Sequence, residues 1–190
     1  MSGFDAKHRI DRMLSPERRR WLDPDRILEA IGIKEGMILV DIGAGPGFFA
    51  LPAAKKVGST GKVYALDVEP AMLQRVRERA EAEAITNLET LLSQDGRLPL
   101  PSRVADTVLL ANVLHEVDEP LKLLKEAARV LRAAGTLAVV EWNREPGEGG
   151  PPMEERLAPE RLEALLRGSG FVRVESFDVG PRHYGMLGWK

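Results

Sequence analysis

Short runs of apolar residues alternate along this chain with segments whose apolar positions recur every three or four residues. The runs are typical of buried strands, whereas the spaced positions are typical of helices with one buried face. Helices are predicted at 49–57, from Pro70 onward, from an N-cap at Asp118 to Gly135, and at 162–168. Strands are predicted at 37–42, 63–68, 107–111, 136–142, 172–177 and 184–189.

Nearly continuous apolar strands separated by amphipathic helices predict a doubly wound α/β fold, in which helices cover both faces of a mostly parallel sheet. Too few residues join the last two strands for a parallel crossover, so we expect an antiparallel C-terminal hairpin. The Gly-, Pro- and Glu-rich segment 143–156 is predicted to be a mobile loop at the C-terminal edge of the sheet. Ligands bind at that edge in such folds.

The chain of 190 residues has the size of a single domain. Residues 36–190 carry the alternating pattern and are predicted to form that domain. Residues 1–35 mix a few apolar positions with many charges, and we expect a helical segment that acts as a lid over the ligand-binding edge. Three consecutive arginines within it, Arg18 to Arg20, are interpreted as a solvated helix face.

Charge and composition exclude several classes of function. Lys and Arg number 27 against 29 Asp and Glu, so no basic excess attracts nucleic acid. Cysteine is absent, which excludes disulfides, thiolate metal sites and cysteine nucleophiles, and no metal site is expected. No apolar stretch is long enough to span a membrane and no signal-peptide pattern is present, so we expect a cytoplasmic protein. No pattern indicates an oligomeric state.

The first predicted strand is joined to a helix by the segment Asp41-Ile42-Gly43-Ala44-Gly45-Pro46-Gly47-Phe48. Its glycines let the backbone approach a ligand closely, although the same pattern also fits a tight turn without a ligand. Asp67 ends the next strand, 20 residues after Gly47, where an acid accepts the hydroxyl hydrogens of a ribose. A nucleoside-containing ligand is therefore predicted.

Two features separate this segment from loops that bind dinucleotides or phosphates. The dinucleotide fingerprint requires its third glycine where this chain has Phe48, and no Gly-Lys-Ser/Thr sequence follows. The carboxylate of Asp41, at the mouth of the loop, would repel a pyrophosphate and attract an ammonium or sulfonium. A ligand with an adenosine end and a cationic centre is S-adenosylmethionine, whose own carboxylate suits the N–H groups of the loop.

Three blocks of the chain resemble the class I S-adenosylmethionine-dependent methyltransferases, particularly the small group similar to the ubiquinone/menaquinone biosynthesis methyltransferases. The blocks lie at 40–73, 93–117 and 129–142, in the order and spacing of the family. The resemblance implies a Rossmann-like sheet of seven strands, S-adenosylmethionine as the cofactor and a small organic acceptor. One departure is Ala134-Gly135, where the family has Pro-Gly before its fifth strand.

The resemblance also implies roles for individual residues. Asp41 and the glycine loop would face the methionine part, Asp67 the ribose hydroxyls, and Asp95 the adenine amino group. Val68 and Met72 would pack beside the adenine, and the region of Asn112 would lie near the sulfonium. The implied cofactor-binding residues are Asp41, Gly43, Ala44, Gly45, Gly47, Asp67, Val68, Met72, Asp95, Gly96 and Asn112.

His115 and Glu141 are the candidate catalytic residues, because one follows and the other ends a predicted strand at the ligand-binding edge. His115 would act as a general base or merely cap the local loop. Glu141 would bind a polar group of the acceptor in the cleft. Trp142 would form a wall of the pocket or a core contact. His183 is interpreted as a structural residue of the final hairpin.

The leading hypothesis is a methyltransferase that acts on a small organic acceptor, and two other functions stay open. One is a protein that binds S-adenosylmethionine without transferring its methyl group, as a sensor or a non-catalytic partner. The other is a nicotinamide-dependent reductase, which Phe48 and Asp41 oppose. Methylation of arsenite is disfavoured because the chain lacks the thiolates that hold arsenic.

Overall fold

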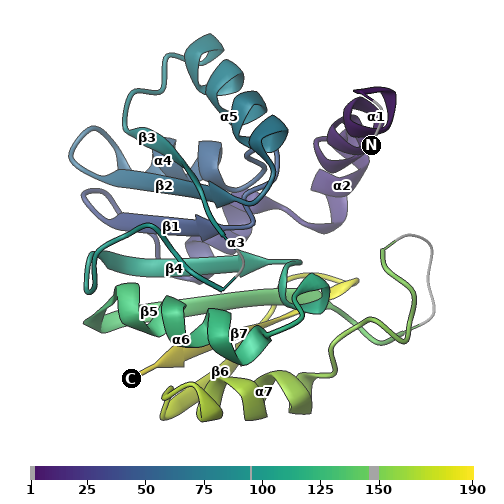
Figure 1. Cartoon of the computed structure of the whole chain (residues 1–190), viewed down its shortest axis with the longest axis vertical. Coiled ribbons are helices and arrows are strands. Elements are labelled where there is room, and N and C mark those ends of the chain that lie inside the picture. The colour runs from purple at the N-terminus through teal and green to yellow at the C-terminus, as the bar shows by residue number, and fades with distance from the viewer. Residues whose placement is uncertain (1–2, 95, 146–149) are drawn as a thin grey trace.

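The structure is a computed structural model that describes residues 3–94, 96–145 and 150–190. Within these residues, seven strands form one sheet in the order β3-β2-β1-β4-β5-β7-β6 (Figure 1). The strands are β1 (Ile38–Ile42), β2 (Lys62–Asp67), β3 (Leu88–Leu92), β4 (Ala105–Ala111), β5 (Leu131–Trp142), β6 (Arg173–Phe177) and β7 (His183–Trp189). The α-helices are α1 (Gly3–Met13), α2 (Pro16–Trp21), α3 (Pro24–Ala30), α4 (Ala50–Val57), α5 (Pro70–Ala82), α6 (Pro120–Val130) and α7 (Pro159–Gly168).

The strands β1 to β5 pair in parallel, and β7 runs antiparallel to both β5 and β6. This pairing confirms the predicted mostly parallel sheet with an antiparallel C-terminal hairpin. The apolar pattern alone missed β3. That strand lies at the edge of the sheet with its leucines at best half-buried, and Glu89 interrupts its apolar run.

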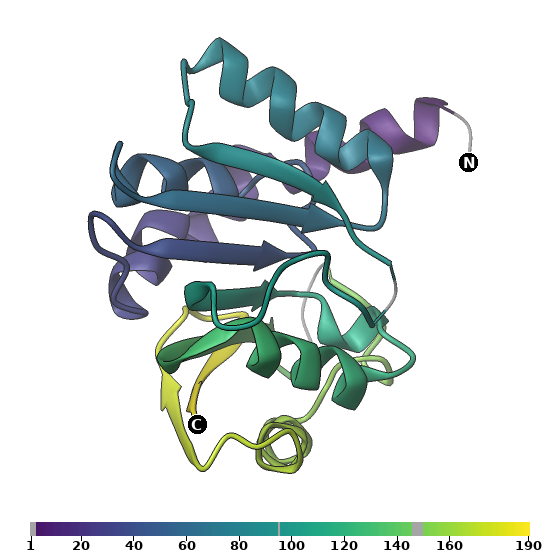
Figure 2. The ribbon, with the colours of Figure 1, turned by 60° about the vertical axis from the view of Figure 1, so that its left-hand side comes forward.

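Alternate strand residues contribute to two hydrophobic clusters, one on each side of the sheet. Leu39 and Leu109 belong to the cluster that includes side chains of α3, α4 and α5. Their neighbours Val40 and Val108 belong to the cluster with α6 and α7, which lie together on the other face (Figure 2). Burial on both faces explains why the strands are almost continuously apolar. Among the described helices, none is long and apolar enough to cross a membrane.

The helix that follows β4 differs from its prediction at both ends. It begins at Pro120 with Glu119 at the N-cap position, so the predicted cap at Asp118 is wrong. It ends at Val130 and the chain passes directly into β5, so Gly135 lies within a strand and does not terminate the helix. An irregularity in the β4–β5 pairing accommodates the first residues of β5, which is why the strand begins earlier than its apolar run.

The N-terminal segment has two structural parts. Ser15 and Asp23 cap α2 and α3, and each is followed by a proline in the first helical turn. α1 and α2 lie beyond the C-terminal ends of β1 and β2 (Figure 1). α3 instead packs against α4, and Leu22, Ile27 and Leu28 are fully buried. The part of residues 1–35 that is placed to cover a ligand is therefore α1 and α2, and the rest belongs to the core.

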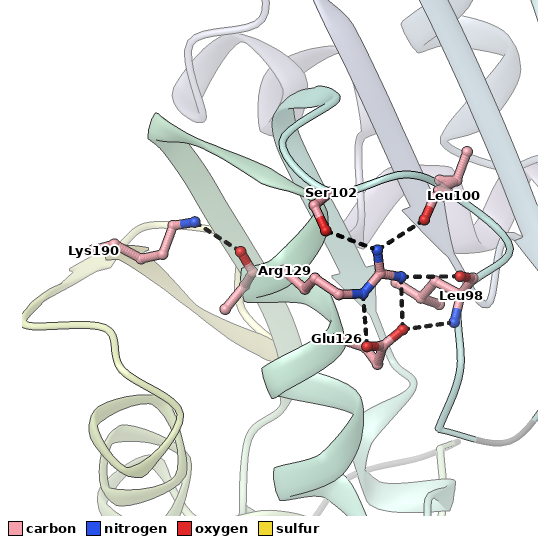
Figure 3. Close-up of polar contacts among 7 residues, drawn as sticks. Leu98, Leu100, Ser102, Glu126, Arg129 and Lys190 are labelled. Atoms are coloured by element: carbon pink, nitrogen blue, oxygen red, sulfur yellow. Dashed lines mark hydrogen bonds and ion pairs between the residues drawn. The ribbon is translucent and has the colours of Figure 1, made fainter.

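The connection from β3 to β4 is tied to α6 by one arginine and one glutamate (Figure 3). Arg129 donates to the carbonyl oxygens of Leu98 at 3.1 Å and Leu100 at 2.9 Å, and pairs with Glu126 at 2.8 Å. Glu126 in turn accepts the N–H of Leu98 at 3.1 Å. The hydrogen bond from Arg129 holds the pKa of the Glu126 carboxyl below its usual value. This network fixes Leu98, which lines the cavity described below.

We expect Arg129→Met to lower the free energy of unfolding by about 1–3 kcal/mol, because it leaves two backbone carbonyls and a carboxylate without their charged donor. Arg77→Met is the matched control, since exposed Arg77 bonds, among the described residues, to the side chains of Gln74 and Thr90 alone, and its effect should stay within about 0.5 kcal/mol. Urea unfolding of both variants measures the difference. Equal effects would contradict the role given to this network.

Candidate active site

A cavity of about 510 Å³ lies at the C-terminal ends of β1, β2 and β4. Most of the residues that the sequence assigned to a cofactor line it. Gly47 is not among the lining residues, and Asp95 lies outside the described residues. The assigned residues that line the cavity are Asp41, Gly43, Ala44, Gly45, Asp67, Val68, Met72, Gly96 and Asn112.

The glycine loop has a backbone that other residues adopt only with strain. Gly43 and Gly45 have φ angles of 68° and 52°, and a Cβ on Gly43 would lie 2.5 Å from Val113 Cγ2. Gly47 has a φ of 85°, and a Cβ there would lie 2.4 Å from Leu51 Cδ1 in the core. Gly43 and Gly45 therefore keep the cavity wall open, whereas Gly47 allows the loop to pack against α4.

Asp67 holds the glycine loop against the end of β2. Its Oδ2 accepts the N–H of Gly45 at 2.8 Å, and its Oδ1 accepts the N–H of Glu69 at 2.9 Å. The side chain is 8% exposed and lines the cavity. Burial raises the pKa of Asp67, and the two amide hydrogen bonds counteract this effect. Each carboxylate oxygen keeps a lone pair for a further donor, such as a hydroxyl group.

Asp41 lies in β1, an interior strand between β2 and β4, with only 1% of its surface exposed. Burial, followed by repulsion from Asp67, raises its pKa to about 8, although the N–H of Ala50 and the charge of Arg18 oppose the shift. Its Oδ2 is buried without a hydrogen-bond partner among the described residues. A buried carboxylate oxygen without a partner at a cavity wall is suited to a cationic ligand group.

Two arginines of the N-terminal helices line the same cavity. Arg9 forms an ion pair with Glu69, which follows β2. Arg18 is partly buried, and its guanidinium lies 4.4 Å from the centre of the Phe48 ring. The interpretation of residues 18–20 as a solvated face is correct for Arg19 and Arg20 but wrong for Arg18. Ser15 and Pro16 in the sequence signal the start of this helix, but no local pattern indicates which side packs inward.

A second cavity of about 400 Å³ adjoins the first, because Met13, Arg18, Asn112 and Glu116 line both. Trp21, Trp142 and His115 contribute further walls of this second cavity. Trp142 and His115 were predicted at the ligand-binding edge of the sheet. The sequence did not indicate that this edge holds two distinct cavities. The two cavities meet near Asn112.

His115 forms a hydrogen-bonded pair with Glu141. It lies in the 3₁₀-helix η1 (Leu114–Glu116), and its Nδ1 is 2.7 Å from Glu141 Oε2. Glu141 also accepts the N–H of Leu114 at 2.8 Å. Burial opposes protonation of His115, but the hydrogen bond and charge of Glu141 outweigh it and raise the His115 pKa. Such a pair orients the imidazole and leaves Nε2 as the nitrogen that can exchange a proton, with the exposed Glu116 Oε1 3.7 Å from it.

Glu141 does not face the cleft, which corrects the prediction from the sequence. Its side chain is fully buried and is absent from the lining of both cavities. The strand β5 lies between β4 and β7, so the end of the strand is covered on both sides. Among the described residues, its carboxylate is hydrogen-bonded to the N–H of Leu114 and to the His115 ring.

His183 belongs to an aromatic group that supports the second cavity. Its ring stacks on Trp21 at 5.2 Å and lies 4.2 Å from Trp142. Both ring nitrogens are buried without a partner among the described residues. Burial, with the positive charges of Arg18 and other arginines, lowers its pKa to about 3. His183 is therefore neutral at physiological pH and packs as an apolar ring.

The fold and the cavity define a class of protein. A doubly wound sheet carries a glycine loop after its first strand, an acid after its second strand and an unpartnered carboxylate beside the loop. This combination suits a cationic adenosyl ligand at the C-terminal edge of the sheet. It is the arrangement of a Rossmann-like S-adenosylmethionine-binding enzyme.

Residues 40–139 match the methyltransferase domain family, and the chain belongs to that family. The chain is 30% identical over 118 residues to the ubiquinone/menaquinone biosynthesis C-methyltransferase UbiE of Salmonella arizonae. The match covers 62% of this chain and 47% of the relative, so the chain spans about half the length of that relative.

Solved structures agree with the family. A SAM-dependent methyltransferase from Aquifex aeolicus superimposes with a TM-score of 0.90 at 35% identity, covering 95% of this chain and 96% of that one. Phosphoethanolamine N-methyltransferase 2 of Haemonchus contortus, solved with S-adenosyl-L-methionine, shares the fold at 16% identity. Its TM-score is 0.74, with 88% of this chain and 52% of that one covered. The present chain therefore belongs to the class I S-adenosylmethionine-dependent methyltransferase family.

The cavity fits the chemistry of S-adenosylmethionine. The unpartnered Oδ2 of Asp41 is an acceptor for a cationic group. Asp67 has acceptor capacity for ribose hydroxyls. A Cβ at Gly43 would collide with Val113, so the backbone rather than a side chain forms the wall at that position. The carboxylate, the remaining lone pairs and the open glycine backbone match a ligand with a cation, a sugar and an amino-acid end.

We expect Asp41→Asn to stabilise the ligand-free protein at high pH. The pKa of Asp41 is raised from 3.8 to about 8 in the folded state, so ionisation of this group costs stability. The free energy of unfolding of the wild type therefore falls increasingly as pH rises between these values. The variant should be more stable by roughly 2–5 kcal/mol at pH 8 and by little near pH 4.

Urea unfolding of the ligand-free protein at several pH values measures this difference. Asp118→Asn is the control, because it removes the same charge from an exposed position. A stability difference that does not grow with pH would contradict the burial of an unpaired charge at Asp41.

Proposed function

We propose that the protein transfers the methyl group of S-adenosylmethionine to a small organic acceptor bound in the second cavity. The observation that carries this proposal is the contact between the two cavities at Asn112, with the His115–Glu141 pair on the acceptor side. Two adjoining compartments with a proton-transfer group on one side suit a two-substrate reaction. A single binding cleft would suffice for a sensor.

In this proposal the first cavity holds the cofactor. Asp41 takes the ammonium group, the N–H groups of the glycine loop face the methionine part, and Asp67 accepts the ribose hydroxyls. Val68 and Met72 pack beside the adenine, with Gly96 at its edge. Asn112 lies at the boundary between the cavities, with a φ of 59° and a buried Oδ1 that has no partner among the described residues. We infer that Asn112 positions the reacting groups.

S-adenosylmethionine supplies a methyl group on a sulfonium, and its transfer joins that carbon to the acceptor and returns the C–S electron pair to sulfur in S-adenosylhomocysteine. The chain itself aligns the acceptor, excludes water and accepts a proton. His115 Nε2 takes the proton from the acceptor, while Glu141 holds Nδ1 and stabilises the resulting imidazolium. Glu141 is a positioning residue in this scheme.

The second cavity limits the acceptor to a small molecule with a planar apolar part. A volume of about 400 Å³ and walls from Trp21 and Trp142 are typical of sites for compact aromatic compounds. The Salmonella relative is named for C-methylation in ubiquinone and menaquinone biosynthesis. A quinone-like acceptor is therefore one class to test, together with other small aromatic compounds.

We expect Asp67→Ala to weaken binding of S-adenosylhomocysteine about 10- to 100-fold, which corresponds to about 1–3 kcal/mol for hydrogen bonds to a charged group. Asp67→Asn should lose less, because one oxygen can still accept an amide hydrogen from the loop. Isothermal titration calorimetry measures both affinities, and circular dichroism confirms that each variant is folded. Wild-type affinity in both variants would contradict the assignment of Asp67 to the ribose.

We expect the rate of methyl transfer to fall as pH drops through the raised pKa of His115, because only the neutral imidazole accepts a proton. Glu141→Gln removes the charge that raises this pKa, so the acidic limb of the pH profile should move to lower pH. His115→Ala should slow transfer by about 100-fold or more.

The measurement uses radiolabelled S-adenosylmethionine with an acceptor found in a panel of small aromatic compounds. His8→Ala is the control, because His8 is exposed. If the pH–rate profile of Glu141→Gln superimposed on that of the wild type, the proposed role of the His115–Glu141 pair in proton transfer would be contradicted.

A further inference from the structure

Arg18 lies at the junction of the two cavities and comes from outside the main domain. It is a residue of α2 and lines both the cofactor cavity and the acceptor cavity. Within the described part of the chain, its guanidinium makes one hydrogen bond: Nη1 donates to the carbonyl oxygen of Met13 at 3.1 Å. Among the described residues, its remaining N–H groups have no hydrogen-bond partner, and Phe48 lies beneath the guanidinium.

The charge of Asp41 acts on Arg18 across the cavity that both residues line, yet the two side chains do not pair. The charge of each group shifts the pKa of the other, but no ion pair joins these two described residues. Burial lowers the pKa of Arg18 to about 10, so it stays charged at physiological pH. One cavity wall thus presents a cation with free donors and, in the buried carboxyl group of Asp41, an acceptor that a cationic ligand group would ionise. A zwitterionic amino acid would satisfy both groups.

We propose that Arg18 binds the carboxylate of the cofactor's amino-acid end, and that this contact fixes α1 and α2 and so completes the acceptor cavity. The inference rests on the proposed function, because it requires S-adenosylmethionine in the first cavity. It gives the N-terminal helices a role that depends on the ligand. A planar guanidinium with free donors is well suited to a carboxylate.

The acceptor cavity depends on these helices for much of its wall. Arg12, Met13, Ser15, Glu17 and Trp21 line it from the N-terminal segment. Met13 also lies against the glycine loop, since a Cβ on Gly45 would be 3.2 Å from its Cε. A cofactor that binds Arg18 therefore fixes these helices and completes the wall of the acceptor cavity. It follows that the cofactor binds first and the acceptor second.

The test compares two ligands that share the adenosine and the thioether but differ in the amino-acid end. S-adenosylhomocysteine has that end, and 5′-deoxy-5′-methylthioadenosine lacks it. Arg18→Met should weaken S-adenosylhomocysteine binding about 10- to 100-fold and change methylthioadenosine binding less than about threefold. Arg19→Met is the matched control on the same helix, because Arg19 is exposed and pairs with Asp25. It should change neither affinity.

Isothermal titration calorimetry gives these affinities, and hydrogen exchange of residues 8–21 tests the effect on the helices. S-adenosylhomocysteine should slow exchange there more than methylthioadenosine does in the wild type, and the difference should disappear in Arg18→Met. Equal losses of both affinities, no loss, or equal protection by both ligands would overturn the inference while the proposed function stands. A wild-type protein that binds neither ligand would overturn both.

Discussion

The carboxylate of Asp41 occupies a position in the sheet where its charge is unfavourable. It lies in an interior strand of the sheet, burial disfavours its ionised form, and Asp67 on the adjacent strand repels it. A buried ion without a partner destabilises a protein by about several kcal/mol. A cationic ligand removes that penalty on binding, so the unfavourable position becomes a source of affinity. The same charge opposes a pyrophosphate, which separates this site from dinucleotide-binding loops on similar folds.

The surrounding structure brings a ligand to that charge without closing the cavity. Gly43 and Gly45 keep side chains out of the wall, and Asp67 ties the loop to the end of β2 through Gly45. The network of Arg129 and Glu126 holds the opposite wall at Leu98. The N-terminal helices then provide the complementary positive charge. In the proposed reaction, the acceptor side is organised separately around the His115–Glu141 pair, so cofactor binding and proton transfer would depend on different elements of the same sheet edge.

Local patterns were sufficient to predict the parallel sheet, its terminal hairpin and the cavity lined by Asp41 and Asp67. Each of these features depends on residues that are close in sequence, such as a strand followed by a glycine loop. Arg18 was misinterpreted because its burial is decided by packing against Phe48, 30 residues further along the chain. Glu141 was expected in the cleft because its position at the end of a strand places it at the ligand-binding edge of the sheet. The sequence does not show that Leu114 and His115 bind its carboxylate instead. The edge strand β3 was missed because half-buried strands lack a continuous apolar run.

The ionisation of Asp41 should respond to the ligand if the cavity binds a cation beside this carboxyl group. Carbon-13 NMR titration of its carboxyl group, assigned by comparison with Asp41→Asn, can follow that ionisation with and without S-adenosylhomocysteine. The account predicts a pKa of about 8 in the free protein and a marked fall when the ligand's ammonium group is bound. An ordinary aspartate pKa in the free protein, or a raised pKa that the ligand leaves unchanged, would contradict it.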